Sequence, residues 1–344
     1  MYSSMEKLRI LHTADLHITD DSGAKVFAKI VDLASKEKVD VLLIAGDLFD
    51  SAVASGSDKS YITALFDKIP SIKVFLVAGN HDPLPTYKDV EFPGNVYLFG
   101  HETEKFELEH VDIYGASFYE NHQSTALVEN FVLDNPEKIN ILLMHGDLGQ
   151  VSKYNPFNIQ QLEKTGVDYA ALGHVHAHGG IQKAGNTFYA YAGIPQGRGY
   201  DEIGKKGIIL GNVFKGYVDL EFVPMSDMEF CEIKVDVSNC QDYNEICDII
   251  RKSASELKHA YKIVLVGCFD GEFEIRIDLI RNILSEYENI KIVDATTIAL
   301  NLEEISGEYS LRGLFVKKCL EKGLDKRIIN CGLAALDGKK VALW

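Results

Sequence analysis

Apolar and polar residues follow one another along the first part of the chain in blocks that predict strands and helices in turn. Apolar runs at residues 8–13, 39–45 and 72–78 have the length and composition of buried strands. Between these strands, residues 24–37 and 58–69 have apolar side chains at helical spacing, which predicts two helices. This β-α-β order predicts an α/β fold with a parallel sheet.

The middle of the chain is richer in strands. One short helix is predicted at 157–164, and a loop of small residues at 51–57 is expected to be mobile. A glycine-rich loop is predicted at 193–199. The predicted strands are 96–99, 106–108, 111–114, 139–144, 167–172, 188–192, 207–213 and 217–223.

A domain boundary is predicted at Pro224 and the three residues that follow it. The next predicted elements are strand 230–237, helix 243–257, strand 262–267, helix 278–287, strand 290–295, and helices 310–320 and 326–336. We therefore expect a first domain at 1–224, an α+β domain at 228–300 and a helical tail at 305–344. The tail's apolar residues pack on the chain's own core or form a docking surface for a partner.

Composition indicates a globular protein of 344 residues, with 46% hydrophobic and 25% charged residues. No apolar run approaches the roughly 18 residues that cross a membrane, and the start lacks the apolar core of a signal peptide. We therefore expect a cytoplasmic protein. Its six cysteines, which form no C-x-x-C pair, are expected to be reduced thiols.

The net charge of −16 argues against strong independent binding to nucleic acid. Residues 1–227 carry 19 lysines and arginines against 31 aspartates and glutamates. Non-specific binding to nucleic acid relies on lysine and arginine contacts to phosphates. Bound divalent cations would offset part of the negative charge locally.

Polar side chains with metal-binding chemistry follow five of the predicted strands. In order, these are Asp15 and His17, Asp47 and Asp50, Asn80 and His81, His145, and His174 and His176. Open α/β sheets place their ligands at the carboxyl ends of strands, so we expect these side chains to converge. In D-x-H and H-x-H spacing both side chains lie on one face of an extended backbone.

Asp47 is predicted to be the centre of this set. Gly46 lets the backbone turn where the preceding strand ends, and the two carboxylate oxygens of Asp47 can bridge two cations. One cation would bind Asp15, His17, Asp47 and His176, and the other Asp47, Asn80, His145 and His174. Oxygen and imidazole donors favour Mn, Fe or Zn over Ca or Mg.

One motif alone would be weak evidence for a metal site. A lone D-x-H or H-x-H pair belongs to a surface or a satisfied core roughly nine times in ten. Five such motifs in one order, each closing an apolar strand, make that explanation improbable.

At these residues the sequence resembles the calcineurin-like metallophosphoesterases. Their signature (D-x-H, G-D-x-x-D, G-N-H-[DE], H and G-H-x-H) is filled at every position within residues 8–224. Within this family, segments 12–17, 45–50 and 79–83 are similar to the bacterial SbcD and YhaO-type DNA repair exonuclease subunits. Loop 192–207 is most similar to the YhaO-type branch. Archaeal and eukaryotic relatives carry a histidine where this chain has Asp50.

The resemblance implies a sandwich of two β-sheets flanked by helices, followed by a small α+β capping domain and a helical tail. It also implies an Mn-dependent DNA exonuclease or endonuclease that acts in DNA repair. Its expected partners are DNA, a second copy of the chain, and an SMC-like coiled-coil ATPase of the SbcC or YhaN type that binds the tail.

The predicted mechanism is an in-line attack on phosphorus by a hydroxide that bridges the two metals. His81 is predicted to be the general acid for the leaving oxygen, or a hydrogen-bond donor in the transition state, and Asp50 to orient it. Arg198 either contacts a substrate phosphate or is an ordinary loop arginine. His178 is expected outside the ligand set, and Asp147 either holds His145 or caps the next segment.

Two other functions remain open at this stage. A small-molecule phosphodiesterase or phosphatase would use the same ions, because a fold does not determine its substrate. Such an enzyme would need no capping domain and no docking tail. A scaffold with an inactive site is disfavoured by the complete set of ligands.

Overall fold

The computed structural model describes residues 6–19, 21–50, 56–149, 151–269, 274–298 and 301–338. The chain divides into two compact units, Met1–Phe230 and Cys231–Trp344. Most of the loop expected to be mobile at 51–57 lies outside the described residues. Within the described part of the chain, no helix is both long and apolar enough to span a membrane.

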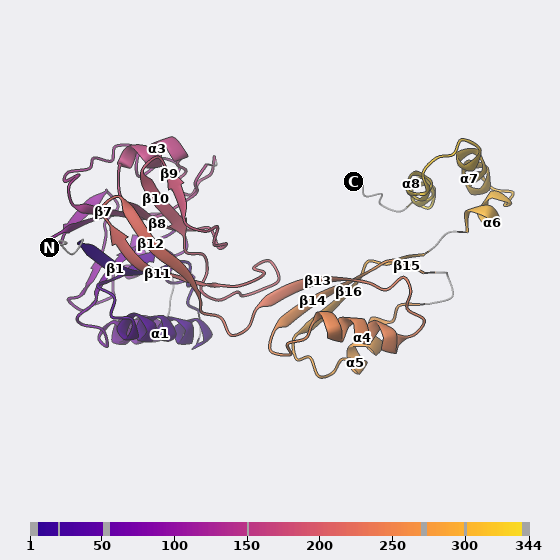
Figure 1. Ribbon diagram of the computed structural model, residues 1–344, viewed down its shortest axis with the longest axis horizontal. Helices are drawn as coiled ribbons and strands as arrows, with labels where there is room; N and C mark the ends of the chain where they lie inside the picture. The colour runs from indigo at the N-terminus through magenta and orange to yellow at the C-terminus, as the bar shows by residue number, and fades with distance from the viewer. Residues whose placement is uncertain are drawn as a thin grey trace, which may run out of the picture. The chain divides into compact units, whose positions relative to one another are not determined.

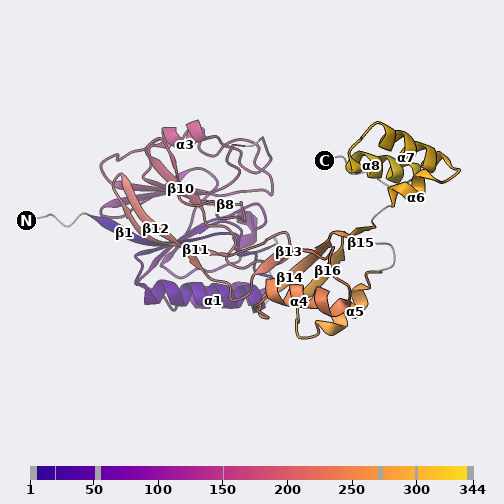
Figure 2. The same ribbon diagram turned by 45° about the vertical axis from the view of Figure 1, so that its right-hand side comes forward.

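The first unit contains two six-stranded sheets (Figures 1 and 2). The first sheet has the order β12-β11-β1-β2-β3-β4. Its strands are β1 (Lys7–Thr13), β2 (Val41–Ala45), β3 (Lys73–Val77), β4 (Val96–Leu98), β11 (Gly207–Phe214) and β12 (Tyr217–Pro224). Strands β1 to β4 are parallel, so the carboxyl ends of β1, β2 and β3 lie at one edge of the sheet.

The second sheet has the order β5-β6-β7-β8-β10-β9. Its strands are β5 (Glu104–Glu107), β6 (Val111–Ala116), β7 (Ile139–His145), β8 (Tyr169–Gly173), β9 (Gln182–Ala184) and β10 (Thr187–Tyr191). Strands β6, β7, β8 and β10 are parallel, and β5 and β9 are antiparallel edges. Strand β9 was not predicted, because its three residues include one apolar side chain.

Helices cover the outer faces of both sheets. Helices α1 (Asp21–Lys36) and α2 (Gly56–Phe66) pack on the first sheet, and α3 (Ile159–Thr165) packs on the second. Alternate residues of β2 show the layers, because successive strand residues face opposite ways. Leu42 and Ile44 join the core formed with α1, whereas Leu43 and Ala45 join the core between the sheets. This arrangement confirms the predicted sandwich.

The second unit begins with a three-stranded sheet of order β13-β14-β16. Its elements are β13 (Phe230–Asp236), α4 (Tyr243–Ser253), β14 (Ala260–Val266), α5 (Ile277–Ile283) and β16 (Ile290–Asp294), with a short ladder of β15 (Cys268–Phe269) and β17 (Thr297–Ile298). Three helices follow: α6 (Leu302–Ser306), α7 (Leu311–Glu321) and α8 (Lys326–Leu336). These helices share a small apolar core of their own. Helix α6 was not predicted, because five residues are too few to show helical spacing.

Candidate metal centre

The predicted metal ligands meet where the carboxyl ends of strands from both sheets come together. Strands β1, β2 and β3 carry Asp15, His17, Asp47 and Asn80, and strands β7 and β8 carry His145, His174 and His176. Two backbone hydrogen bonds continue the pairing of β1 and β2 into these loops. The amide of Asp15 donates to the Gly46 carbonyl at 3.0 Å, and that of His17 to the Asp47 carbonyl at 2.9 Å.

The backbone of this region is held in unusual conformations. Four of the predicted ligands have positive φ angles: Asp15 (53°), His17 (46°), Asp47 (51°) and His174 (101°). Non-glycine residues in the left-handed region carry a conformational cost of roughly 1–3 kcal/mol each, and such residues gather at functional sites. Gly79 leaves room for the centre, because a Cβ atom there would collide with the Asp47 carboxylate.

Donor atoms form two groups around Asp47. In the first, one donor atom each from Asp15, His17 and His176 lie within 4.8 Å of one another. The Nε2 atoms of His17 and His176 are 3.1 Å apart. In the second group, the Oδ1 atom of Asn80 is 3.0 Å from His145 Nε2 and 2.9 Å from His174 Nδ1.

Asp47 lies between the two groups. Its Oδ2 atom is 3.4 Å from His145 Nε2 and 3.9 Å from His17 Nε2. Its other oxygen accepts a hydrogen bond from the backbone amide of His81 at 2.8 Å. One carboxylate oxygen therefore faces both groups.

An oxygen atom lies beside the outward-facing nitrogen of each of the four histidines. The contacts are His17 Nδ1 to Asp50 Oδ1 (3.0 Å), His145 Nδ1 to the Ala45 carbonyl (2.9 Å), His174 Nε2 to Asp147 Oδ1 (3.4 Å) and His176 Nδ1 to Glu202 Oε1 (2.7 Å). At His145 and His176 these contacts are hydrogen bonds, which favour a proton on the outer nitrogen and leave a lone pair on the inner one. The inner lone pairs therefore face one another and the carboxylates.

Lone pairs and carboxylates that face one another in a buried site require positive charge between them. Asp15, Asp47 and His145 are almost completely buried. Burial raises the pKa of the Asp15 carboxyl. Burial acts in the same direction on Asp47, but His145 holds the pKa of that carboxyl well below its usual value. The mixture of carboxylate, amide and imidazole donors fits divalent cations such as Mn, Fe or Zn.

Comparison with known proteins identifies the family. The profile of the calcineurin-like phosphoesterases matches residues 8–178. The uncharacterized metallophosphoesterase YhaO of Bacillus subtilis is 30% identical over 284 residues, which cover 73% of this chain and 68% of that protein. This chain is a calcineurin-like metallophosphoesterase. The family predicted from the five motifs is thereby confirmed, and the protein is a metal-dependent hydrolase.

Two further relatives have names that refer to DNA repair or nuclease activity. The DNA double-strand break repair protein Mre11 of Sulfurisphaera tokodaii is 27% identical over 296 residues, covering 76% of this phosphoesterase and 74% of Mre11. The SbcD component of the nuclease SbcCD of Rhodobacter capsulatus is 35% identical over 88 residues, or 22% of each chain.

Asp50 contacts more than the side chain that it was predicted to orient. Its Oδ1 atom is 3.4 Å from His81 Nδ1, 3.0 Å from His17 Nδ1 and 3.5 Å from Arg198 Nη1. His81 is partly exposed, and its ring lies edge-on to that of His17 with centroids 4.8 Å apart. Asp50 therefore links a predicted ligand, the predicted acid and the arginine of the glycine-rich loop of this phosphoesterase.

Two carboxylates that support the centre were not among the predicted site residues. Buried Asp82 accepts hydrogen bonds from the amides of Asp47 (3.1 Å), Phe49 (3.0 Å) and Gly79 (2.8 Å), and from the hydroxyl of Tyr87. Glu202 accepts from His176 and from the Arg198 amide at 2.7 Å. The available signal was that Asp82 closes the Gly-Asn-His-Asp motif and Glu202 follows the glycine-rich loop.

Other histidines of the phosphoesterase have partners outside the donor groups. His178 Nδ1 is 2.7 Å from the Tyr191 carbonyl, and its ring stacks on Phe222. His12 is buried between the sheets, with its Nδ1 atom 2.9 Å from the Tyr169 hydroxyl. Asp147, predicted to hold His145 or to cap a segment, lies near His174 instead of His145.

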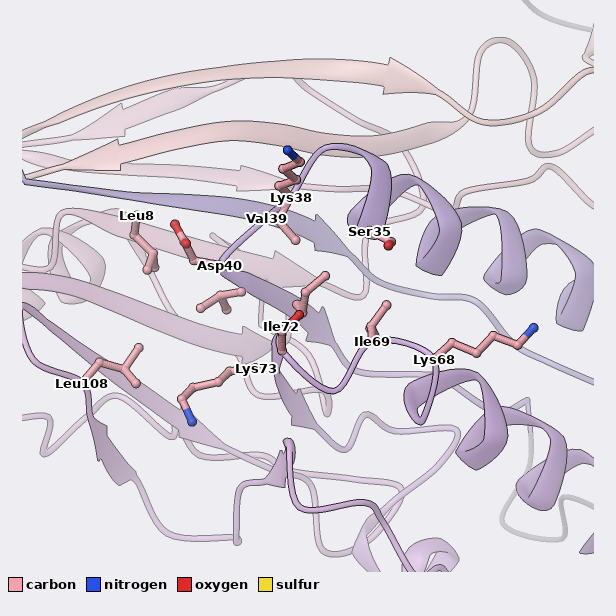
Figure 3. A pocket seen from close by; sticks show the side chains of 12 residues that line it. Leu8, Ser35, Lys38, Val39, Asp40, Lys68, Ile69, Ile72, Lys73 and Leu108 are labelled. Atoms are coloured by element: carbon pink, nitrogen blue, oxygen red, sulfur yellow. The ribbon is translucent and has the colours of Figure 1, made fainter.

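A separate hollow of about 450 Å³ lies at the opposite, amino-terminal end of β1, β2 and β3 (Figure 3). Lysines contribute three of the side chains around it, and the ammonium ends of Lys38, Lys68 and Lys73 point in different directions. Without converging charges, this hollow offers no built site for an anion. The chemistry of the phosphoesterase is therefore assigned to the other edge of the sheets.

Proposed function

We propose that this phosphoesterase is the nuclease component of a DNA repair complex and hydrolyses DNA phosphodiesters with two divalent cations, preferentially Mn²⁺. The observation that carries the proposal is the convergence of six other donor side chains around the Asp47 carboxylate. One cation would be held by Asp15, His17, Asp47 and His176, and the other by Asp47, Asn80, His145 and His174.

When bound, such a pair of cations activates water and neutralises charge on the phosphate oxygens. The chain's own residues hold the donors in place and position the substrate. His81 supplies a proton to the leaving oxygen or donates a hydrogen bond in the transition state, and the Asp50 carboxylate orients its ring. Arg198 would contact a substrate phosphate, a role supported by its position beside Asp50 and Glu202, the carboxylates next to His17 and His176.

Names of the relatives support DNA as the substrate. One is a DNA double-strand break repair protein, and another is the SbcD component of a nuclease named SbcCD. We propose that this chain likewise acts in the cytoplasm as a homodimer with an SMC-like coiled-coil ATPase. The ATPase would bind the helical tail, and the unit that contains β13, β14 and β16 would be the capping domain.

The acidic charge of the chain is consistent with this division of labour. A net charge of −16 disfavours tight binding of DNA by this chain alone. In the proposed complex, the cations and the ATPase add positive charge that strengthens DNA binding. DNA affinity should therefore rise on addition of the ATPase.

The test of the function compares substrates under identical Mn²⁺ conditions. Linear duplex DNA, bis-p-nitrophenyl phosphate and cyclic nucleotides are each incubated with the wild type and with Asp47→Ala, in the presence and absence of the ATPase. We expect the wild type to cleave the DNA and Asp47→Ala to have no activity on it. Asp40→Ala is the matched control, because Asp40 precedes the opposite end of β2 and accepts the Arg9 amide at 2.8 Å. Turnover confined to the small diesters would instead identify a small-molecule phosphodiesterase.

The role of His81 has its own prediction. His81→Gln should lower kcat by at least a hundredfold, because loss of a general acid costs about 10²–10⁴-fold, while metal and substrate binding stay within a few-fold. The measurement is single-turnover cleavage together with calorimetric Mn²⁺ binding. His178→Gln is the control, since His178 contacts the Tyr191 carbonyl outside the centre. Turnover by His81→Gln within a few-fold of the wild type would reject the assignment.

A further inference from the structure

A cavity of about 330 Å³ adjoins the metal centre, and the proposed chemistry leaves it without a role. Its walls combine apolar and polar side chains and come from three parts of the first unit. These are the loop after β1 with helix α1, the glycine-rich loop, and residues 228–230, at which the first unit ends. The apolar side chains that form the walls are Leu16, Val26, Pro195, Met228 and Phe230.

The cavity borders the candidate metal centre, with which it shares a wall residue. His17, a predicted metal ligand, lines the cavity as well as the first donor group. Arg198 also lines it, and its Nη1 atom is 3.5 Å from Asp50 Oδ1, which is itself 3.0 Å from His17 Nδ1. A group attached to the reacting phosphate can therefore enter the cavity past a positive charge.

The composition of the walls indicates what that group is. Cavities for small organic groups begin at about 300 Å³ and are apolar with a few polar groups for orientation. Phe230 offers an aromatic surface, and Tyr200 packs edge-on against it at 5.2 Å between centroids. Gln196, whose side chain carries an amide, also lines the cavity. A planar ring with polar edges matches this surface, as a nucleobase does.

We propose that this cavity receives the nucleobase of a nucleotide next to the scissile phosphate. The inference rests on the proposed nuclease function and deepens it. A base in the cavity is unstacked from its neighbour and unpaired, because a base inside a duplex is not accessible to a protein pocket. The substrate at the moment of cleavage is therefore a single strand or a frayed end.

The experiment uses the full-length protein and short single strands with one cleavable phosphodiester, the other linkages being methylphosphonates. One strand carries both bases beside that phosphodiester. Two others carry an abasic tetrahydrofuran analogue on its 5′ side or its 3′ side. We expect one abasic strand to lose about tenfold in kcat/KM, as stacking of one base on an aromatic side chain implies. The same strands, end-labelled and titrated in EDTA, should show a parallel loss of affinity without metal.

Phe230→Ala and Met228→Ala test whether the cavity causes the difference. Each should bring the ratio of kcat/KM between base-bearing and abasic strands toward one. Met228→Ala covers the case in which Phe230→Ala fails to fold. Tyr217→Ala is the matched control, because Tyr217 is an exposed aromatic residue at the start of β12, paired with Phe214 at the far end of the first sheet. It should leave the ratio unchanged.

The outcomes separate the two proposals. Equal cleavage of all three strands by the wild type would overturn the base pocket and leave the nuclease function standing. A base preference that survives in both cavity variants would also overturn the pocket. Cleavage of bis-p-nitrophenyl phosphate with none of the three strands cut would overturn the nuclease function, and the base pocket with it.

Discussion

The two units of the chain differ in where they place polar and apolar side chains. In the first unit, carboxylates and imidazoles are buried at the junction of two sheets, and the outer nitrogens of His145 and His176 lie within hydrogen-bond distance of an oxygen. In the second unit, the three tail helices leave large apolar residues exposed, among them Leu311, Leu314 and Ile328. All groups of potential metal donors found among the described residues belong to the first unit.

This difference is consistent with the proposal that chemistry belongs to the first unit and assembly to the tail. Burying a charged group is costly unless it is paired, so a buried polar cluster implies a function that requires it. An exposed apolar patch on a small helical segment costs solubility and is typical of an interaction surface. Substitutions in the first unit should therefore affect hydrolysis, and those in the tail should affect association alone.

The largest effect is expected where the backbone leaves no room beside Asp47. In Gly79→Ala the new Cβ would meet the Asp47 carboxylate and its amide, so that carboxylate must move. We expect hydrolysis of bis-p-nitrophenyl phosphate to fall by more than about a hundredfold, since misplaced groups of this kind cost about 10²-fold. Gly94→Ala is the control, because its Cβ would have open space. Activity of Gly79→Ala within threefold of the wild type would contradict this geometry.

A smaller effect is expected one contact further from the cations. Glu202→Gln keeps the shape of the side chain but removes the charge beside His176 Nδ1. Loss of such a partner weakens metal binding by about 10–100-fold. Titration of Mn²⁺ by calorimetry measures this directly, without turnover. Glu104→Gln is the control. Glu104 lies on the edge strand β5 and accepts a hydrogen bond from the Gly100 amide, so this variant should bind Mn²⁺ as the wild type does. Equal affinity in both variants would show that Glu202 has no part in holding His176.

Sequence patterns predicted the individual strands, and the convergence of the candidate ligands at their ends, because both can be read from local sequence. Asp15, Asp47 and His145 each follow a strand whose apolar run is readable by itself, and parallel strands bring their ends together. The sandwich of two sheets came from the resemblance to the family, since periodicity does not tell which strands share a sheet. Strand β9 and helix α6 were missed because each is too short to show a period.

Supporting contacts were harder to predict than the ligands. Glu202 reaches His176 across 26 residues, and Asp82 joins loops that follow two different strands. Contacts of this kind depend on how loops fold back in three dimensions, and a single carboxylate in a loop looks ordinary in the sequence. Asp50 was predicted beside His81, but its closer approach to His17 could be measured only in the folded chain.

A moderate effect, on stability instead of chemistry, is expected from buried His12. Burial lowers the pKa of His12 from 6.5 to about 3, so the unfolded chain takes up a proton as pH falls below 6.5 and the folded chain does not. Stability that His12 contributes is therefore complete above pH 6.5 and declines as pH falls toward 3. Between pH 7.5 and pH 5 the loss should be about 2 kcal/mol.

Urea unfolding at the two pH values tests this assignment. Between pH 7.5 and pH 5, the unfolding free energy of His12→Gln should fall by about 2 kcal/mol less than that of the wild type. His110→Gln serves as the control, because His110 is half-exposed on the surface. The same pH dependence in the wild type and His12→Gln would show that other groups cause the decline.

The smallest effect on hydrolysis is expected from the tail, and it decides whether the comparison holds. Leu314 and Ile328 are 56% and 53% exposed, so replacing both with serine removes little buried area from the core of the tail. Hydrolysis of bis-p-nitrophenyl phosphate by this double variant should stay within twofold of the wild type. Its affinity for the coiled-coil ATPase should fall at least tenfold, because apolar anchors dominate binding of helices to such surfaces.

Lys317→Ser, an exposed polar change on the same helix α7, should bind the ATPase normally. A parallel loss of hydrolysis in the double variant would mean that the tail supports the metal centre, and the division between chemistry and assembly would then fail.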